Sequence, residues 1–518
     1  MENILLLAAS TFPKNLSEST YCYKDEQGQL FDDIKGYYQL EPVPKLMMRK
    51  YPQDNLKIVI LCTKETMQIS EHEEIHALIE EYPEEDETYI NVKSPTGFFM
   101  HRICSEKSST VKIIKKSEEA GCICCQNKEK TIEFVLVPLD EKQINIAIAN
   151  VAKYIQDFFE NFEIREFWID THGGSRDISA YTTAVVSLLK IKNIFPKHIF
   201  SVPYNHGEKK QKIVDQKDIY RVLDLVSGMD EFINYGSAEL LSQYYANAKG
   251  KTKKIIQAMK EVSLGTQTCS SQIYEKGLDE LGEAIHGYEG ENPLFSVFID
   301  YIKNDYGDLL DKNKRTVIAI VERCNRKHLC QQALTYIESR MPQEFFEKRV
   351  CYYEVNQENN NIIENSINQR KGQKYLVQDK RDYPVYIMNQ LILKNFGEYN
   401  NKTEKWNSWS ANYTKKPTYR SIITRVVDSN NNKQIPEEFD LNLKIDYTGK
   451  IFKMKSDLNL ANQKKAAKLF RLHRALKDCR NNFNHGNNDG KLPLQKIEQA
   501  IGKYVQWTQE LYQTLEKK

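Results

Sequence analysis

The chain has 518 residues, of which 40% are hydrophobic and 28% are charged, and its formal net charge is +2. This length is enough for two or three domains with separate cores, and the composition is ordinary for a globular protein rather than a disordered or fibrous one. A net charge near zero excludes a uniformly basic nucleic-acid-binding chain, so any basic surface must be local.

Targeting signals and cysteine usage indicate the cellular compartment. No stretch reaches the ~18 apolar residues of a membrane span. The apolar start, residues 4–9, has no basic segment before it and is too short for a signal peptide, so we expect no membrane association. The eleven cysteines are odd in number and scattered, which predicts reduced thiols in a cytoplasmic protein. Cys104, Cys122, Cys124 and Cys125 lack the paired spacing of zinc knuckles, so residues 95–130 are predicted to form a surface hairpin without metal.

Short apolar runs alternate with amphipathic segments over the first 200 or so residues. Strands are predicted at residues 4–9, 56–62, 131–137, 165–169 and 198–202, and helices at 143–162 and 178–191. This alternation predicts a doubly wound α/β sheet. Ligands of such sheets bind beyond the carboxyl ends of the strands.

Two polar loops follow predicted strands at that edge. The first contains Ser10 and Thr11, and the second contains Thr171, His172, Gly173, Gly174, Ser175 and Arg176. The two glycines allow a ligand to approach the backbone, and the helix that follows presents free N–H groups to an anion. The polar side chains add donors for phosphates or ribose hydroxyls. Alternatively the glycines only turn a strand into a helix, since no glycine-rich nucleotide motif is present.

The rest of the chain is predicted to be mainly helical. Residues 240–312 show helical periodicity and predict a connector. A bundle follows, whose middle contains Asn-rich segments at 356–368 and 400–417 that are predicted to be loops.

The most informative stretch is Arg480-Asn481-Asn482-Phe483-Asn484-His485-Gly486. Arg480 can direct two N–H donors at a phosphate, and His485 can transfer a proton near neutral pH. RNA supplies its own nucleophile, the ribose 2′-OH, so these groups could cleave it without metal. On a regular helix the two residues would lie ~140° apart. They can therefore share a cleft only at an irregular helix end, which Gly486 favours.

A basic amphipathic helix is predicted at 461–480, directly before this stretch. Leu469, Leu472, Leu476 and Cys479 form one apolar stripe. The basic residues are predicted to lie mostly on the opposite face, and those expected to contact RNA are Lys468, Arg471, Arg474 and Lys477. The alternative is a solvated basic helix whose terminal histidine interacts favourably with the helix dipole.

Arg480-Asn481-x3-His485 resembles the R-(N/H/D)-x3-H signature of HEPN ribonucleases. These are helical bundles that usually dimerise, so that two copies of the motif form one cleft. The resemblance implies catalytic roles for Arg480 and His485 and orienting roles for Asn481 and Asn484.

Residues 169–174, Ile-Asp-Thr-His-Gly-Gly, resemble the DxTHG-type motif of CRISPR-associated Rossmann-fold (CARF) domains, although here the aspartate directly precedes the threonine. Residues 215–236 are similar to the segment that closes such a domain. CARF followed by HEPN is the order found in accessory ribonucleases of type III CRISPR systems. The resemblance implies a Rossmann-like CARF domain at 1–240, a helical connector at 241–314 and an all-α HEPN domain at 315–518.

This resemblance implies a homodimeric, metal-independent endoribonuclease that cleaves single-stranded RNA and leaves 2′,3′-cyclic phosphate ends. It implies a cyclic oligoadenylate as activator, tetra-adenylate in preference to hexa-adenylate, bound by the 10–11 and 171–176 loops, which could also degrade it. No stable DNA binding is expected. An alternative is a CARF regulator that binds nucleic acid without cutting it. A metal-dependent DNA nuclease would need clustered acidic residues after a strand in the C-terminal half, and the sequence has no such pattern.

Overall fold

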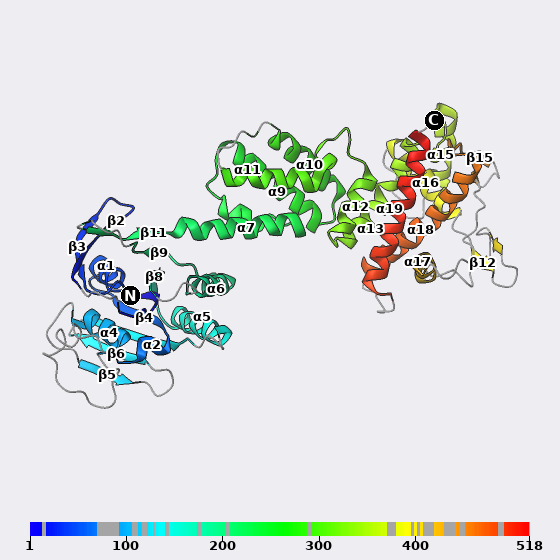
Figure 1. Ribbon diagram of the computed structural model, residues 1–518. Helices are drawn as coiled ribbons and strands as arrows, with labels where there is room; N and C mark the ends of the chain where they lie inside the picture. Colours follow the sequence, from blue (N-terminus) through cyan, green and yellow to red (C-terminus); the bar gives the residue numbers. More distant parts are fainter. Residues whose placement is uncertain are drawn as a thin grey trace. The chain divides into compact units, whose positions relative to one another are not determined.

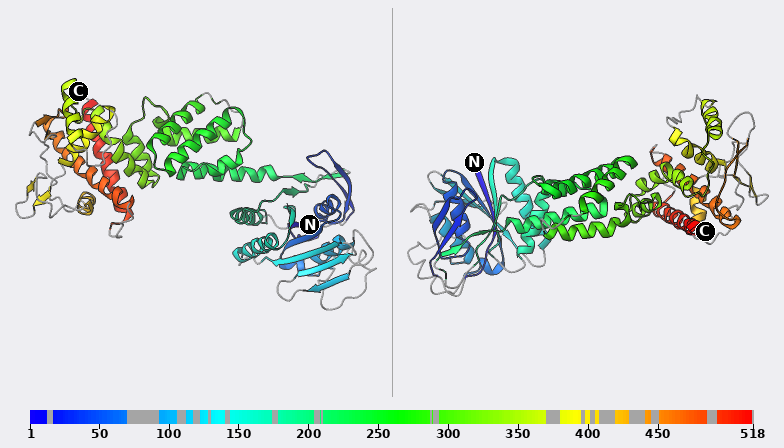
Figure 2. Two further views of the ribbon diagram at one scale, coloured as in Figure 1. Left: turned by 180° about the vertical axis from the view of Figure 1, so that it is seen from behind. Right: turned by 90° about the horizontal axis from the view of Figure 1, so that it is seen from above.

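The computed structural model describes most of the chain. The described residues are 1–12, 17–69, 93–105, 112–116, 122–127, 130–139, 144–173, 178–203, 208, 210–286, 288, 293–369, 380–394, 398–400, 405–407, 419–428, 441–444, 451–484 and 492–516. Contacts divide the chain into two compact units, Met1–Leu223 and Asp224–Lys518, which Figures 1 and 2 show as ribbons. Within the described ranges, no helix combines the length and the apolar character needed to cross a membrane.

The first unit is built on an eight-stranded sheet with the order β11-β9-β8-β1-β4-β7-β6-β5. Its strands are β1 (Glu2–Ala8), β4 (Asn55–Cys62), β5 (Lys112–Lys116), β6 (Cys122–Asn127), β7 (Lys130–Pro138), β8 (Ile164–Asp170), β9 (His198–Ser201) and β11 (Val214–Asp215). The strands from β9 to β7 are parallel, and β11, β6 and β5 are added antiparallel at the edges. The predicted N-terminal α/β sheet is therefore confirmed.

Helices cover both faces of this sheet (Figure 1). One core includes α1 (Pro42–Lys50) and α4 (Pro95–Ser105), and the other includes α5 (Ile144–Asn161) and α6 (Ile178–Ile191). In β1, Leu5 and Leu7 belong to the first core, whereas Ile4 and Leu6 belong to the second. Successive side chains of a strand point to opposite faces, so a strand that is apolar at every position requires cover on both.

A second, three-stranded sheet adds to the first of these cores. It consists of β10 (Lys210–Lys212), β2 (Ser19–Lys24) and β3 (Leu30–Gly36) in that order. Tyr21, Phe31 and Ile34 from this sheet are buried together with α1. The short helix α2 (Lys64–Met67) follows β4, and α7 (Lys217–Tyr235) follows β11.

The segment 95–130 differs in part from the predicted surface hairpin. β5 and β6 pair as a hairpin, but β6 also pairs with β7 and so extends the main sheet. Residues 95–105 form α4, and the buried rings of Phe98 and Phe99 attach this helix to the core. Cys104 is disulfide-bonded, contrary to the expectation of reduced thiols, whereas seven other described cysteines are free.

The second unit is helical, as predicted for the C-terminal part. Its helices after α7 are α8 (Glu239–Tyr244), α9 (Gly250–Gln267), α10 (Ser271–Ile285), α11 (Pro293–Tyr306), η1 (Gly307–Leu310), α12 (Val317–Arg326), α13 (Cys330–Ser339), α14 (Met341–Glu347), α15 (Gln357–Gln369), η2 (Lys380–Asp382), α16 (Tyr383–Lys394), α17 (Tyr419–Val427), α18 (Leu460–Asn484) and α19 (Leu494–Glu516). Two short antiparallel pairs accompany them: β12 (Glu398–Asn400) with β13 (Lys405–Asn407), and β14 (Asn442–Lys444) with β15 (Ile451–Lys453).

One hydrophobic core extends through this unit, from Leu225 to Tyr512. Buried residues of the predicted connector, 241–314, and of the predicted bundle, 315–518, both belong to this core. The division between the two units falls inside α7, after Leu223. The Asn-rich segment 356–368, predicted to be a loop, forms α15, which buries Ile363.

α9 and α10 form a hairpin whose backbones approach closely at two glycines. A Cβ atom added to Gly265 would lie 2.4 Å from the backbone nitrogen of Tyr274. A Cβ atom added to Gly277 would lie 2.6 Å from that of Val262. Both distances are too short for a carbon next to a nitrogen, so this packing requires glycine at both positions.

We expect Gly265→Ala to destabilise the second unit by about 1–3 kcal/mol, the usual cost of overpacking a close contact. Gly502→Ala in α19 is the matched control, because its added Cβ would meet only Asn325 Nδ2, at 3.8 Å. That change should stabilise the helix by up to ~1 kcal/mol. Thermal unfolding followed by calorimetry measures both, and equal melting temperatures for the two variants would contradict the close packing.

Candidate functional site

The carboxyl ends of β1 and β8 lie side by side in the first unit. The two strands are parallel neighbours, and Leu6 is opposite Ile169 in the register. The loops that follow them, which carry Ser10 and Thr171, consequently leave the sheet at the same edge. The structure therefore brings together the described parts of the two loops predicted to bind a ligand. Residues 174–176, with Gly174, Ser175 and Arg176, lie outside the described residues.

Gly173 is the point where the second loop meets β1. A Cβ atom at this position would lie 1.8 Å from the carbonyl oxygen of Ala8 and 2.5 Å from Leu40 Cδ2. Because a backbone carbonyl cannot move aside as a flexible side chain can, any other residue here would push the two loops apart. The first glycine of the pair thus has a packing role, whatever binds at this edge.

A turn at residues 37–41 bridges both loops, and sequence analysis did not identify it. Tyr38 Oη lies 3.0 Å from Ser10 Oγ, and Gln39 Oε1 lies 3.1 Å from His172 Nε2. Burial raises the pKa of Tyr38, which keeps its phenol protonated. The available sequence signal was the Pro42 that starts α1, since proline is favoured in the first turn of a helix.

Glu41 holds this turn in place. Its buried carboxylate accepts hydrogen bonds from the N–H groups of Tyr37 and Tyr38, at 3.2 and 2.9 Å. Lys45 Nζ lies 2.8 Å from the same carboxylate and donates to the carbonyl of Lys35, also at 2.8 Å. A buried ion pair is tolerated when hydrogen bonds satisfy both partners, and here they tie the turn to β3 and α1.

The predicted donors at 171 and 172 are engaged within the protein. Thr171 Oγ1 donates to the carbonyl of Phe200 at 3.0 Å, and the backbone N–H of His172 donates to Asp170 Oδ1 at 2.9 Å. Burial lowers the pKa of His172, so its imidazole is neutral at pH 7. In contrast Thr11 is exposed. Among the described loop residues, a ligand would meet preorganised neutral groups and not a charged side chain.

Asp170 is the buried carboxyl group beneath these loops. Among the described residues its Oδ2 atom has no hydrogen-bond partner, and burial raises its pKa from 3.8 to about 7. The hydrogen bond from the N–H of His172 favours the ionised form but does not offset the burial. The carboxyl group therefore binds its proton near neutral pH.

We expect Asp170→Asn to stabilise the protein more at pH 8 than at pH 5. A folded-state pKa above the unfolded one means that stability is lost as pH rises from about 4 to 7, by up to about 4 kcal/mol. The amide keeps the acceptor for His172 and carries no charge. Melting temperatures of parent and variant at pH 5, 6, 7 and 8 measure the effect. A difference that stays constant across this range would show that Asp170 does not titrate there.

The motif in the second unit lies at the end of α18, which contains Arg480, Asn481 and Asn484. Arg480 Nη1 lies 3.1 Å from Glu338 Oε2 on α13 and 3.5 Å from Asn481 Oδ1. The Arg480 side chain is 28% exposed. Lys477 Nζ lies 3.4 Å from the other carboxylate oxygen, Glu338 Oε1. His485 lies outside the described residues, as does the side chain of Asn484.

The basic face of α18 is narrower than predicted. Arg471 is only 4% exposed, which contradicts its expected place on an RNA-binding surface. The Lys477 side chain is 13% exposed, and Arg474 Nη2 lies 3.1 Å from Asp478 Oδ1. Lys468 is half-buried. The reason is that α18 is central and contacts α13, α16, α17 and α19. It is therefore buried on more of its surface than the single predicted apolar stripe.

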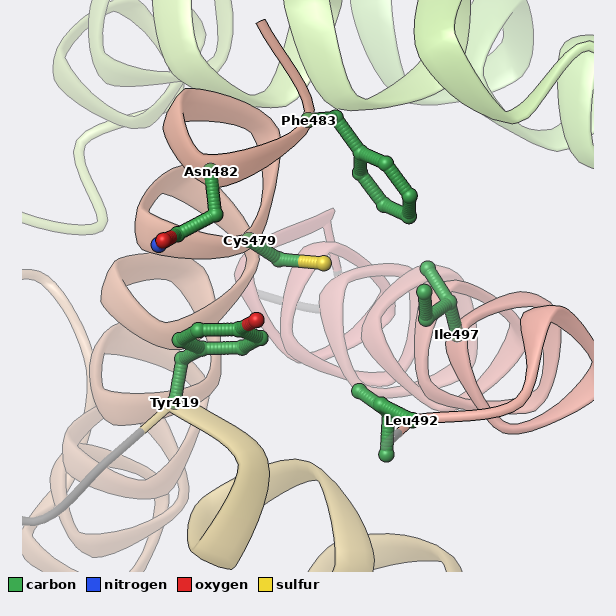
Figure 3. A pocket seen from close by; sticks show the side chains of 6 residues that line it. All are labelled: Tyr419, Cys479, Asn482, Phe483, Leu492 and Ile497. Carbon is green, nitrogen blue, oxygen red and sulfur yellow. The ribbon is translucent and has the colours of Figure 1, made fainter. Parts of the chain in front are cut away.

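A small pocket lies beside the end of α18 (Figure 3). It is lined by Tyr419, Cys479, Asn482, Phe483, Leu492 and Ile497, and the Cys479 thiol points into it. The amide of Asn482 donates to the carbonyl of Asp478 at 2.7 Å. Arg480 does not line this pocket. This pocket is thus not the cleft predicted for the motif.

A second histidine on α18, His473, is structural. It is fully buried, and its Nδ1 atom lies 2.8 Å from Tyr504 Oη on α19. Burial, together with the charges of Lys477 and Arg474, lowers the pKa of His473 to about 3. This imidazole stays neutral at any pH where the protein would work, so it cannot take the acid–base role predicted for His485.

Within the part of the chain that the structure describes, no group of three or more His, Cys, Asp or Glu side chains is placed to hold a metal ion. No protein-family model matches the chain, and no curated protein sequence matches it.

Proposed function

We propose that this protein is a HEPN-type, metal-independent endoribonuclease of type III CRISPR defence, activated by a cyclic oligoadenylate bound at a CARF-type N-terminal unit. The observation that carries the proposal is the charge cluster at the end of α18. Two cations, Lys477 and Arg480, lie against the single carboxylate of Glu338, and 28% of the Arg480 side chain stays exposed. The partly exposed guanidinium of Arg480 is suited to binding a phosphate of RNA.

The proposed reaction uses the 2′-OH of the substrate as nucleophile. Its oxygen attacks the adjacent phosphorus, the bond to the 5′-oxygen breaks, and the products carry a 2′,3′-cyclic phosphate and a 5′-OH. Arg480 offsets the charge that develops on the phosphate oxygens, because a preorganised donor acts most strongly where charge develops. His485 accepts the proton of the 2′-OH or donates a proton to the leaving 5′-oxygen. Asn481 and Asn484 orient the motif or the phosphate.

The proposed assembly is a homodimer with two copies of the motif in one cleft. A cyclic oligoadenylate with its own two-fold symmetry would suit a pair of CARF-type loops. The parallel sheet supports this assignment, because its polar loops 10–11 and 171–173 meet at the carboxyl edge, where ligands of such sheets bind.

Replacing Arg480 or His485 by Ala should lower RNA cleavage by at least ~10²-fold, the usual effect of losing a transition-state donor or an acid–base group. Lys503→Ala is the matched control, since it removes an exposed cation of α19. The measurement is single-turnover cleavage of labelled single-stranded RNA, with analysis of the product ends. Parental activity in either motif variant would remove the motif from the mechanism.

The same assay separates the rival functions when it is run on RNA and DNA, each with and without EDTA. The proposed enzyme cleaves only RNA and keeps its activity in EDTA. A regulator would bind RNA without cleaving it. Activity that disappears in EDTA and returns with Mg²⁺ or Mn²⁺ would indicate a metal-dependent nuclease instead.

His172→Ala should weaken activator binding and reduce activation, because the imidazole lies at the edge where the two loops meet. Thr171→Ala should act in the same direction. Typical allosteric coupling corresponds to ~5–150-fold activation, and the variants should lose most of it while basal cleavage stays. Titration of cyclic tetra- and hexa-adenylate against cleavage rate measures this, with Ser187→Ala on α6 as control. If both variants are activated at the same activator concentrations as the parent, the ligand binds elsewhere.

A further inference from the structure

We propose that Glu338 is a positioning residue for Arg480, an inference that rests on the proposed function. No sequence motif points to Glu338, which lies on α13, far from the motif in the chain. Its two carboxylate oxygens are divided between the two cations of α18: Oε1 is 3.4 Å from Lys477 Nζ, and Oε2 is 3.1 Å from Arg480 Nη1. Lys477 and Arg480 are three positions apart, so they lie on the same face of the helix.

The core fixes both partners of this contact. On α13, the residues directly before Glu338, Tyr336 and Ile337, are fully buried. On α18, Leu476 and Cys479 flank the two cations and are buried as well. Because both backbones are anchored, Glu338 holds the guanidinium at a defined place, and only one-fifth of the Glu338 side chain is exposed.

A held guanidinium favours the transition state over the ground state. An arginine side chain loses rotamer entropy when it is immobilised, and Glu338 imposes this loss before RNA arrives. The planar guanidinium has five N–H donors, and a single carboxylate oxygen cannot engage all of them. The negative charge of Glu338 also opposes the binding of anionic RNA. Removing that charge should therefore tighten binding and slow the reaction, a split that loss of folding would not produce.

The matched control is the ion pair of Glu275 with Arg340. Glu275 Oε1 and Oε2 lie 3.1 and 2.6 Å from Arg340 Nε and Nη2. The Glu275 side chain is 23% exposed, close to the exposure of Glu338. It belongs to the same unit but is not part of the cluster at Arg480. Glu275→Gln thus removes a comparable ion pair without touching the motif.

The experiment compares Glu338→Gln and Glu275→Gln in the full chain, with and without cyclic tetra-adenylate. One measurement is the single-turnover rate on labelled single-stranded RNA. The other is the Kd for the same RNA with a 2′-deoxy nucleotide at the scissile position, which lacks the nucleophile. Glu338→Gln should lower the rate by about 10- to 100-fold, less than direct loss of a transition-state donor. It should lower the Kd about threefold, the modest effect expected when one negative charge that solvent partly screens is removed. Glu275→Gln should change neither the rate nor the Kd, and both variants should have the same melting temperature.

Two results would overturn the positioning role. In the first, Glu338→Gln behaves like Glu275→Gln. In the second, Glu338→Gln cleaves faster than the parent, which would mean that Glu338 inhibits Arg480. The double variant Glu338→Gln with Arg480→Ala adds a test. If Glu338 acts through Arg480, the double variant matches Arg480→Ala alone, whereas a further loss would show an independent role. Failure of the proposed function is recognised separately, because Arg480→Ala would then cleave RNA like the parent or the parent would not cleave at all.

Discussion

The packing of α13 against α18 decides what Arg480 can do. Leu476 and Cys479 are buried in the core of the second unit, so the face of α18 that carries Lys477 and Arg480 is turned toward Glu338. Lys477, Arg480 and Glu338 are held together there. A flexible arginine on a solvated helix would have no such partner, and its affinity for a phosphate would be reduced by the cost of ordering it.

The carboxyl edge of the N-terminal sheet follows the same physical logic. The backbone contact between Gly173 and Ala8 sets the distance between two loops, and the buried pair of Glu41 with Lys45 fixes the turn that crosses them. Both places therefore present polar groups whose positions are decided by buried contacts a few ångströms away. Preorganisation of this kind lowers the entropic cost of binding and increases the effect of each donor.

The shared core of the second unit bears on how a ligand signal would reach the motif. One core extends from Leu225 on α7 to Tyr512 on α19, so the segment predicted as a connector is packed with the bundle and not hinged to it. Packed helices respond to a local change by discrete rearrangement, because close-packed cores have low compressibility. A ligand that activates the proposed enzyme would have to bind one arrangement more tightly than another.

Local patterns in the sequence were sufficient to predict the strands β1, β4, β7 and β8 and the helix α6, because apolar runs and amphipathic periods act over a few residues. They also placed the 10–11 and 171–173 loops at one edge, since parallel strands share their carboxyl ends. The prediction of a loop from the many asparagines of α15 is wrong, because burial of Ile363 stabilises a helix there.

Only the tertiary structure decided which side chains surround the candidate groups. Glu338, the 37–41 turn and the burial of Arg471 each depend on contacts between segments far apart in the chain. A helical period shows that α18 has an apolar stripe, but it does not show that four helices pack around α18. Which charges are paired, and which are buried, follows from that packing and is not encoded in the spacing of residues along one helix.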